Sequence, residues 1–235
     1  MVTLNDICMR DYDKAYFADS VECLDLDRFE TTLSGDNSAT MDASVGIADW
    51  QSNRAVNHRH LLIELRFGYK STANLDIKNM RAKVAHSREL LDSERISDWA
   101  LFLFDTNVAP QAQNYFSRIS KQYGDYRSWL TMDVESFGNY VIDSSSLPYQ
   151  TENNLSAIEA DFRNKYATGG LDSVEGLYKY WKERILQYKL RYNIAESRAI
   201  AETILQFLLT LSFPKNSLEN DYLALMLEEV QGLLE

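Results

Sequence analysis

Two opposite charges interrupt one of the apolar runs of the sequence. Residues 60–70 read HLLIELRFGYK, and Glu64 and Arg66 lie among leucine, isoleucine and phenylalanine residues. Because residues two apart share a face of a β-strand, Glu64 and Arg66 are predicted on one face and the odd-numbered apolar residues on the other. An ionised glutamate is costly to bury unless a cation or a metal ion pairs with it. The run therefore predicts a strand with a charged site on one face.

A second acid, Asp49, lies in the preceding candidate strand SVGIADWQ. If the two strands are neighbours, Asp49 and Glu64 can approach each other, and two carboxylates at one point favour a bound divalent cation that neutralises both. The competing interpretation is an ion pair between Glu64 and Arg66 at the rim of the sheet, a kind of pair that contributes little to stability. The sequence leaves both interpretations open.

Strands and helices are predicted to alternate in the first part of the chain. Pro110, Pro148 and Pro214 each indicate a boundary. Asn74 is a candidate N-cap for the helix that follows the charged strand. The predicted elements are a mostly helical segment 11–33, strands at 40–44, 45–51 and 61–67 with a polar and basic loop at 52–60, a helix at 73–91, a strand at 99–104, a helix at 109–122 and a strand at 129–134.

After Pro148 the pattern becomes wholly helical. Helices are predicted at 154–166, 173–192 and 194–211, and Ser217 is expected to cap the last one. We expect an α/β core at 1–148 with a mixed central sheet flanked by helices, and an all-helical C-terminal extension at 149–235 packed on it.

The order of these features resembles the PD-(D/E)XK restriction-endonuclease-like superfamily. The shared features are an acid that ends one strand, a loop of about a dozen residues, an apolar strand with Glu-x-basic and then a helix. The resemblance covers roughly residues 10–106. It implies an αβββαβ core in which an Asp from one strand and Glu/Asp-x-Lys from the next surround Mg²⁺, and the metal activates water against a phosphodiester.

Carried over residue by residue, the resemblance implies that Asp49 and Glu64 are catalytic metal ligands and that Arg66 holds the position of the lysine. The sequence departs from the family pattern because no proline precedes Asp49 and because arginine keeps its proton and cannot serve as a base. Lys70 shares the strand parity of Glu64 and could supply the amine.

Other residues could complete such a site. Lys78 or Lys83 could supply an amine from the helix after the charged strand. Family members often place an acid on their first helix, and Glu22 and Glu30 are the candidates for that acid. His86 is expected to be solvated on the basic flank of the helix.

The chain carries a net charge of −11, which argues against non-specific nucleic-acid binding over its whole surface. Between Gln51 and Arg95, however, nine basic residues face five acidic ones. This segment is consistent either with a surface that binds DNA or RNA or with a solvated basic helix face. The candidate nucleic-acid contacts are Arg54, His58, Arg59, His60, Lys78 and Lys83.

Several other functions lack a motif in this sequence. It has no GxxxxGK[ST], GxGxxG, GxSxG or HExxH pattern and no CxxC pair that could bind zinc. The start of the chain lacks the apolar core of a signal peptide, and no run spans a bilayer, so we expect a cytoplasmic protein without membrane contacts.

The sequence thus predicts either a Mg²⁺-dependent nuclease or an inactive descendant of one. The alternative is a non-enzymatic protein-interaction module on a degenerate nuclease-like scaffold. In that case the apolar C-terminal helices would bind a protein partner or form a homodimer.

Overall fold

The computed structural model describes residues 2–18, 20–35, 39–51, 54–123, 128–139 and 194–234, with Ala160, Arg163, Asn164, Tyr166, Gly176–Tyr178 and Tyr180–Lys182. The chain divides into unit 1, Met1–Tyr149, and unit 2, Gln150–Glu235. Each unit has its own apolar core. Among the described residues, no helix combines the length and the apolar character needed to cross a membrane.

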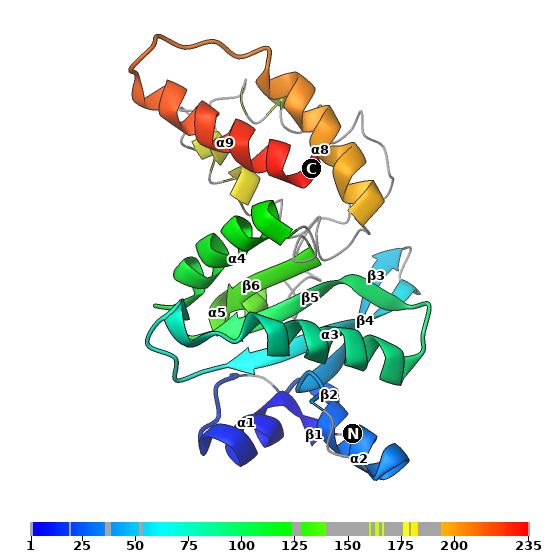
Figure 1. Ribbon diagram of the computed structural model, residues 1–235. Helices are drawn as coiled ribbons and strands as arrows, with labels where there is room; N and C mark the ends of the chain where they lie inside the picture. Colours follow the sequence, from blue (N-terminus) through cyan, green and yellow to red (C-terminus); the bar gives the residue numbers. More distant parts are fainter. Residues whose placement is uncertain are drawn as a thin grey trace. The chain divides into compact units, whose positions relative to one another are not determined.

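Unit 1 is built on a mixed sheet of six strands that follow one another in chain order (Figure 1). The pairings from β1 to β4 are antiparallel, and those of β4 with β5 and of β5 with β6 are parallel. The predicted mixed sheet flanked by helices, followed by a helical C-terminal part, is confirmed. The strands are β1 (Val2–Thr3), β2 (Glu22–Asp25), β3 (Ala43–Gln51), β4 (Arg54–Arg66), β5 (Ile96–Phe104) and β6 (Trp129–Asp133).

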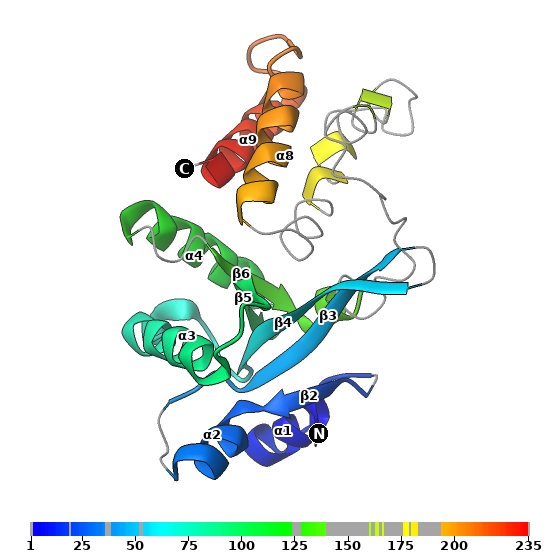
Figure 2. The same cartoon turned by 90° about the vertical axis from the view of Figure 1, so that its right-hand side faces the viewer.

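Helices pack on the two faces of this sheet (Figure 2). Even-numbered residues of β4 and β5, such as Leu62 and Phe102, share a core with α3 and α4. On the other face, Phe67 contacts Tyr12, Tyr16 and Phe17. The helices of unit 1 are α1 (Leu4–Tyr12), α2 (Leu26–Ser34), α3 (Ile77–Leu91), α4 (Ala109–Tyr123) and α5 (Val134–Phe137), with a short 3-10 helix at Thr72–Asn74.

The predicted helical segment 11–33 is wrong, because strand β2 separates α1 from α2. β2 has only four residues, which is too short for a clear period-2 pattern, and its Cys23 and Asp25 are buried. Asp25 ends this strand and caps α2 by accepting a hydrogen bond from the backbone N–H of Arg28. α3 likewise begins after Asp76, which caps it in place of Asn74.

Strands β3 and β4 form a hairpin that is longer than predicted. The predicted strands at 40–44 and 45–51 correspond to one strand, β3, and the predicted loop at 52–60 is largely the first half of β4. β2 pairs with β3 only at Ala43 and Ser44, and β5 pairs with β4 only from His60 onward. In the described part of the chain, Ile47–Gln51 and Arg54–Arg59 therefore pair only with each other, and we call them the β3–β4 ribbon (Figure 2).

Unit 2 contains α8 (Ile194–Leu208) and α9 (Leu218–Leu234), which share an apolar core. Ser217 accepts a hydrogen bond from the Asn220 backbone N–H, as expected of the residue before the last helix. Glu229 of α9 accepts hydrogen bonds from Tyr178, Trp181 and Lys182. The helices predicted at 154–166 and 173–192 lie mostly outside the described residues.

Candidate active site

Glu64 lies on β4 with its side chain 1 % exposed. Two cations contact the same carboxylate oxygen, Oε1: Lys83 Nζ at 2.7 Å and Arg66 Nη2 at 2.7 Å. The other oxygen, Oε2, is buried without a hydrogen-bond partner. Because a buried carboxylate oxygen is a strong acceptor, this oxygen has free capacity for a further ligand.

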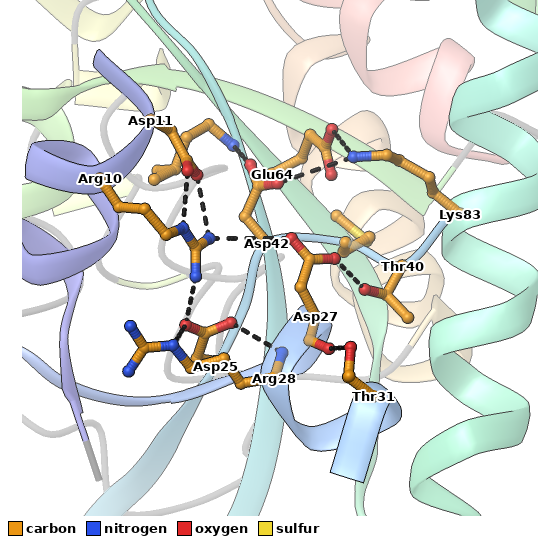
Figure 3. Close-up of polar contacts among 12 residues, drawn as sticks. Arg10, Asp11, Asp25, Asp27, Arg28, Thr31, Thr40, Asp42, Glu64 and Lys83 are labelled. Atoms are coloured by element: carbon orange, nitrogen blue, oxygen red, sulfur yellow. Dashed lines mark hydrogen bonds and ion pairs between the residues drawn. The ribbon is translucent and has the colours of Figure 1, made fainter. Parts of the chain in front are cut away.

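Asp42 is the second acid beside Glu64 (Figure 3). Its Oδ1 lies 3.6 Å from Lys83 Nζ, and its Oδ2 accepts a hydrogen bond of 2.6 Å from the backbone N–H of Leu65. The backbone carbonyl of Leu65 accepts a hydrogen bond of 2.6 Å from the Tyr12 hydroxyl. The pairing of β3 with β4 begins at Ala43 and Ile63. Beyond it, the Leu65 N–H and carbonyl form hydrogen bonds with the side chains of Asp42 and Tyr12.

Four residues, Asp42, Glu64, Arg66 and Lys83, thus form what we call the Asp42–Glu64 cluster. Two carboxylates face two cations, so the cluster carries no net charge when all four are ionised. Lys83 is 17 % exposed, which leaves one side of the cluster within reach of solvent.

Burial and the neighbouring carboxylates set the pKa values in this cluster. Burial, strengthened by the charge of Asp42, raises the pKa of Glu64 to about 8, although Lys83 and Arg66 act in the opposite direction. Burial also raises the pKa of Asp42. For Lys83, burial lowers the pKa, but the attraction of Glu64 and Asp42 is larger and raises it. Lys83 therefore holds its proton at neutral pH.

The predicted approach of Asp49 to Glu64 is wrong. Asp49 is paired with Val56 in the β3–β4 ribbon. Val56 precedes Glu64 by eight residues of β4, which is about 26 Å at about 3.3 Å per residue. Because β3 ends at Gln51 and β4 begins at Arg54, the position across from Glu64 falls just before β3 and is filled by Asp42.

The predicted cations of the site have different positions. Arg66 pairs with Glu64, and Lys83 reaches the cluster from α3. Lys70 follows a turn at Gly68, which has φ +78°, so β4 does not continue to it. Lys70 and Lys78 are both exposed.

Glu30 of α2 is a third buried acid, and it lies against α3. Its Oε1 pairs with His86 Nε2, and its Oε2 is buried without a hydrogen-bond partner. His86, expected to be solvated, is therefore held by a carboxylate, while the other candidate acid, Glu22, is exposed on β2. The next residue along α3, Ser87, accepts a hydrogen bond of 2.8 Å from the Met41 backbone N–H.

The predicted nucleic-acid contacts fall in two places. His58 and His60 are exposed and Arg59 is partly buried on β4, while the side chain of Arg54 lies outside the described set. Lys78 is exposed on α3, whereas Lys83 turns inward to the Asp42–Glu64 cluster. Lys83 therefore does not lie with the exposed residues His58, His60 and Lys78, with which it was predicted to bind nucleic acid.

A second group of ion pairs joins α1 to the start of α2 (Figure 3). Arg10 contacts Asp25 at 2.5 Å, and Thr40 donates a hydrogen bond of 2.5 Å to Asp27. Asp25 also caps α2, so these contacts hold two helix ends together. This group of ion pairs therefore has a structural explanation.

The carboxylates of the cluster belong to the ligand type that hard divalent cations prefer. Mg²⁺ is usually bound by one or two carboxylates with water in the other positions. Asp42 and Glu64 supply two carboxylates, and Glu64 Oε2 has no other partner. Over the described residues, no group of three or more His, Cys, Asp and Glu side chains is placed to hold a metal, so the usual ligand set of zinc is not seen there.

Comparison of the chain with protein-family models, with curated proteins and with solved structures finds no match.

Proposed function

We propose that unit 1 hydrolyses phosphodiester bonds with Mg²⁺, as a nuclease whose metal ligands are Asp42 and Glu64. The observation that carries this proposal is the convergence of two carboxylates and one amine from separate elements. Asp42 precedes β3, Glu64 lies on β4 and Lys83 lies on α3. Lys83 Nζ lies 2.7 Å from Glu64 Oε1 and 3.6 Å from Asp42 Oδ1.

The order of elements supports a restriction-endonuclease-like core. α1, β2, β3, β4, α3 and β5 follow the order αβββαβ, with α2 inserted between β2 and β3. Within this order, Asp42 takes the role that the family resemblance gave to Asp49. Lys83 takes the role of the lysine that Arg66 replaces on the strand.

Each residue of the cluster has a task that its chemistry allows. The bound metal would polarise the phosphate and activate water. Lys83 and Arg66 stay protonated and stabilise the negative charge of the phosphate, and the fork of Arg66 can contact two of its oxygens. When all four groups are ionised the cluster is neutral, and a divalent cation bound in that state would give it the positive charge that an anionic substrate requires.

Cleavage of labelled DNA and RNA with Mg²⁺ or Mn²⁺ tests this proposal. Asp42→Asn and Glu64→Gln each remove a ligand charge while keeping the side-chain volume. We expect each to lower the rate at least about 100-fold, because a catalytic metal supplies several kcal/mol of transition-state stabilisation. Asp49→Asn is the matched control, since it changes an acid of the same hairpin outside the cluster, and it should retain full activity.

Metal titration separates a lost ligand from a lost fold. Isothermal titration calorimetry with Mg²⁺ should show binding to the wild type and to Asp49→Asn but weak binding to Asp42→Asn, with unchanged circular dichroism. Equal cleavage by Glu64→Gln and the wild type would refute the site. A folded wild type without cleavage of either nucleic acid would favour the protein-interaction module, in which Glu64 and Arg66 only pair.

A further inference from the structure

The Asp42–Glu64 cluster contains no group that can accept a proton from an attacking water. Arginine does not deprotonate in proteins, and the pKa of Lys83 is raised by Glu64 and Asp42. The Asp42 and Glu64 carboxylates are the proposed metal ligands, so they are not assigned the proton transfer. The proton acceptor must therefore come from a neighbouring residue.

His86 and Glu30 form a carboxylate–imidazole pair beside the cluster. Glu30, with its side chain 3 % exposed, is paired through Oε1 with His86 Nε2. An ionised carboxylate only accepts hydrogen bonds, so beside an ionised Glu30 the tautomer of the neutral imidazole that fits this contact has its hydrogen on Nε2 and its lone pair on Nδ1. The His86 side chain is 33 % exposed, so water can reach the imidazole while the buried carboxylate holds it in place.

The pair lies one turn from Lys83 on α3. Residues three apart on a helix are neighbours, with about 5–6 Å between their Cβ atoms. The following residue, Ser87, is bonded to the backbone of Met41, the residue before Asp42. One turn of α3 therefore carries Lys83 and His86, and Ser87 next to them bonds to the segment that contains the proposed metal ligand Asp42.

We propose that His86 accepts the proton of the attacking water and that Glu30 positions its imidazole. This inference rests on the proposed phosphodiester hydrolysis. The water oxygen bonds to phosphorus as its proton passes to Nδ1, and the bond from phosphorus to the leaving oxygen breaks. The leaving oxygen takes a proton from solvent, and the imidazolium later returns its proton to solvent.

Among the charged groups near the imidazole, the contact with Glu30 favours this role. Glu30 approaches it from α2, Lys83 and Glu89 lie one turn away on α3, and Asp42 and Glu64 are held by the same Lys83. Glu30 stabilises the imidazolium that forms when the proton is taken up, as a buried carboxylate does for a catalytic histidine.

Chemical rescue tests the inference. His86→Ala should lower the rate of cleavage at least about 100-fold, the usual contribution of a general base, and added imidazole should restore part of it. His86→Gln can still donate to Glu30, so it should fold as the wild type does, cleave as slowly as His86→Ala and gain nothing from imidazole. Glu89→Ala, an exposed residue of the same helix, should retain full activity.

The pH dependence adds a readout that a structural role would not change. In the wild type, kcat/KM should fall toward acid pH, and His86→Gln should lose part of this acid limb and keep the part that follows Glu64, whose pKa is raised to about 8. Glu64→Gln is measured in parallel. If Glu64→Gln is inactive but both His86 variants cleave at the wild-type rate, or if imidazole restores nothing to folded His86→Ala, this inference fails alone; if Glu64→Gln is fully active, the proposed function itself fails.

Discussion

Glu64→Gln is predicted to change how the stability of unit 1 depends on pH. In the wild type, the pKa of Glu64 is raised from its ordinary 4.5 to about 8, mainly because burial opposes the charge of the carboxylate. Gln has almost the same shape and does not titrate. The difference in free energy of unfolding between the two proteins therefore isolates the ionisation of Glu64.

The sign follows from proton binding in the two states. Between pH 4.5 and about 8, the folded protein holds a proton on Glu64 that the unfolded chain releases. The stability that this group contributes is fully present below pH 4.5 and is lost as the pH rises to about 8. The loss is about 1.4 kcal/mol per pH unit and at most about 5 kcal/mol over the whole interval. The variant should therefore gain stability relative to the wild type as the pH rises.

Urea unfolding at pH 5, 6, 7, 8 and 9 measures this difference. Tryptophan fluorescence is a suitable probe, because Trp99 of β5 and Trp129 of β6 are buried. In the sheet, β5 lies next to β4, which carries Glu64, and β6 lies next to β5. Above about pH 8 the difference should become constant. A difference that does not vary with pH, or that favours the wild type increasingly as the pH rises, would show that the ion pairs of Glu64 outweigh its burial.

Substitutions at three further residues test contacts within one unit or the other. Tyr12→Phe keeps the ring but leaves the Leu65 carbonyl without its donor, and should cost about 1–2 kcal/mol in urea unfolding. Asp25→Ala removes the cap of α2 and a buried ion-pair partner, and should cost about 2 kcal/mol, whereas Asp25→Asn should retain the cap and lose less. In unit 2, Glu229→Ala removes an acceptor that a tyrosine, a tryptophan and a lysine share and should cost about 1–3 kcal/mol, detected as faster hydrogen exchange in α9 but not in unit 1.

The predictions that succeeded rest on long or strongly apolar patterns. The run from Trp99 to Phe104 predicts a strand buried on both faces, and β5 is buried throughout that run. The spacing of apolar residues predicts the helix that became α3. Strand parity also placed Glu64 and Arg66 on one face, as their 2.7 Å contact requires.

The partners of Glu64 could not be predicted in the same way. Which acid lies across from Glu64 depends on where β3 ends and β4 begins, and residues 54–60 have the composition of a loop although they belong to β4. Backbone pairing with β3 overrides that composition. Asp42 therefore has no sequence signal beyond being an acid ahead of a strand. Lys83 was one of two lysines considered on the helix, and only the packing of α3 on β4 distinguishes it from Lys78.

Strand β4 combines two levels of backbone protection within one continuous element. From His60 to Arg66 it has neighbours on both sides or side chains that replace them, while in the β3–β4 ribbon the described backbone has hydrogen bonds to one neighbour only. Amide protons of the ribbon should therefore exchange with deuterium through local opening, at a free energy well below that of global unfolding. Glu64 lies in the protected half, so the outer hairpin can open repeatedly without moving the carboxylate that the cluster depends on.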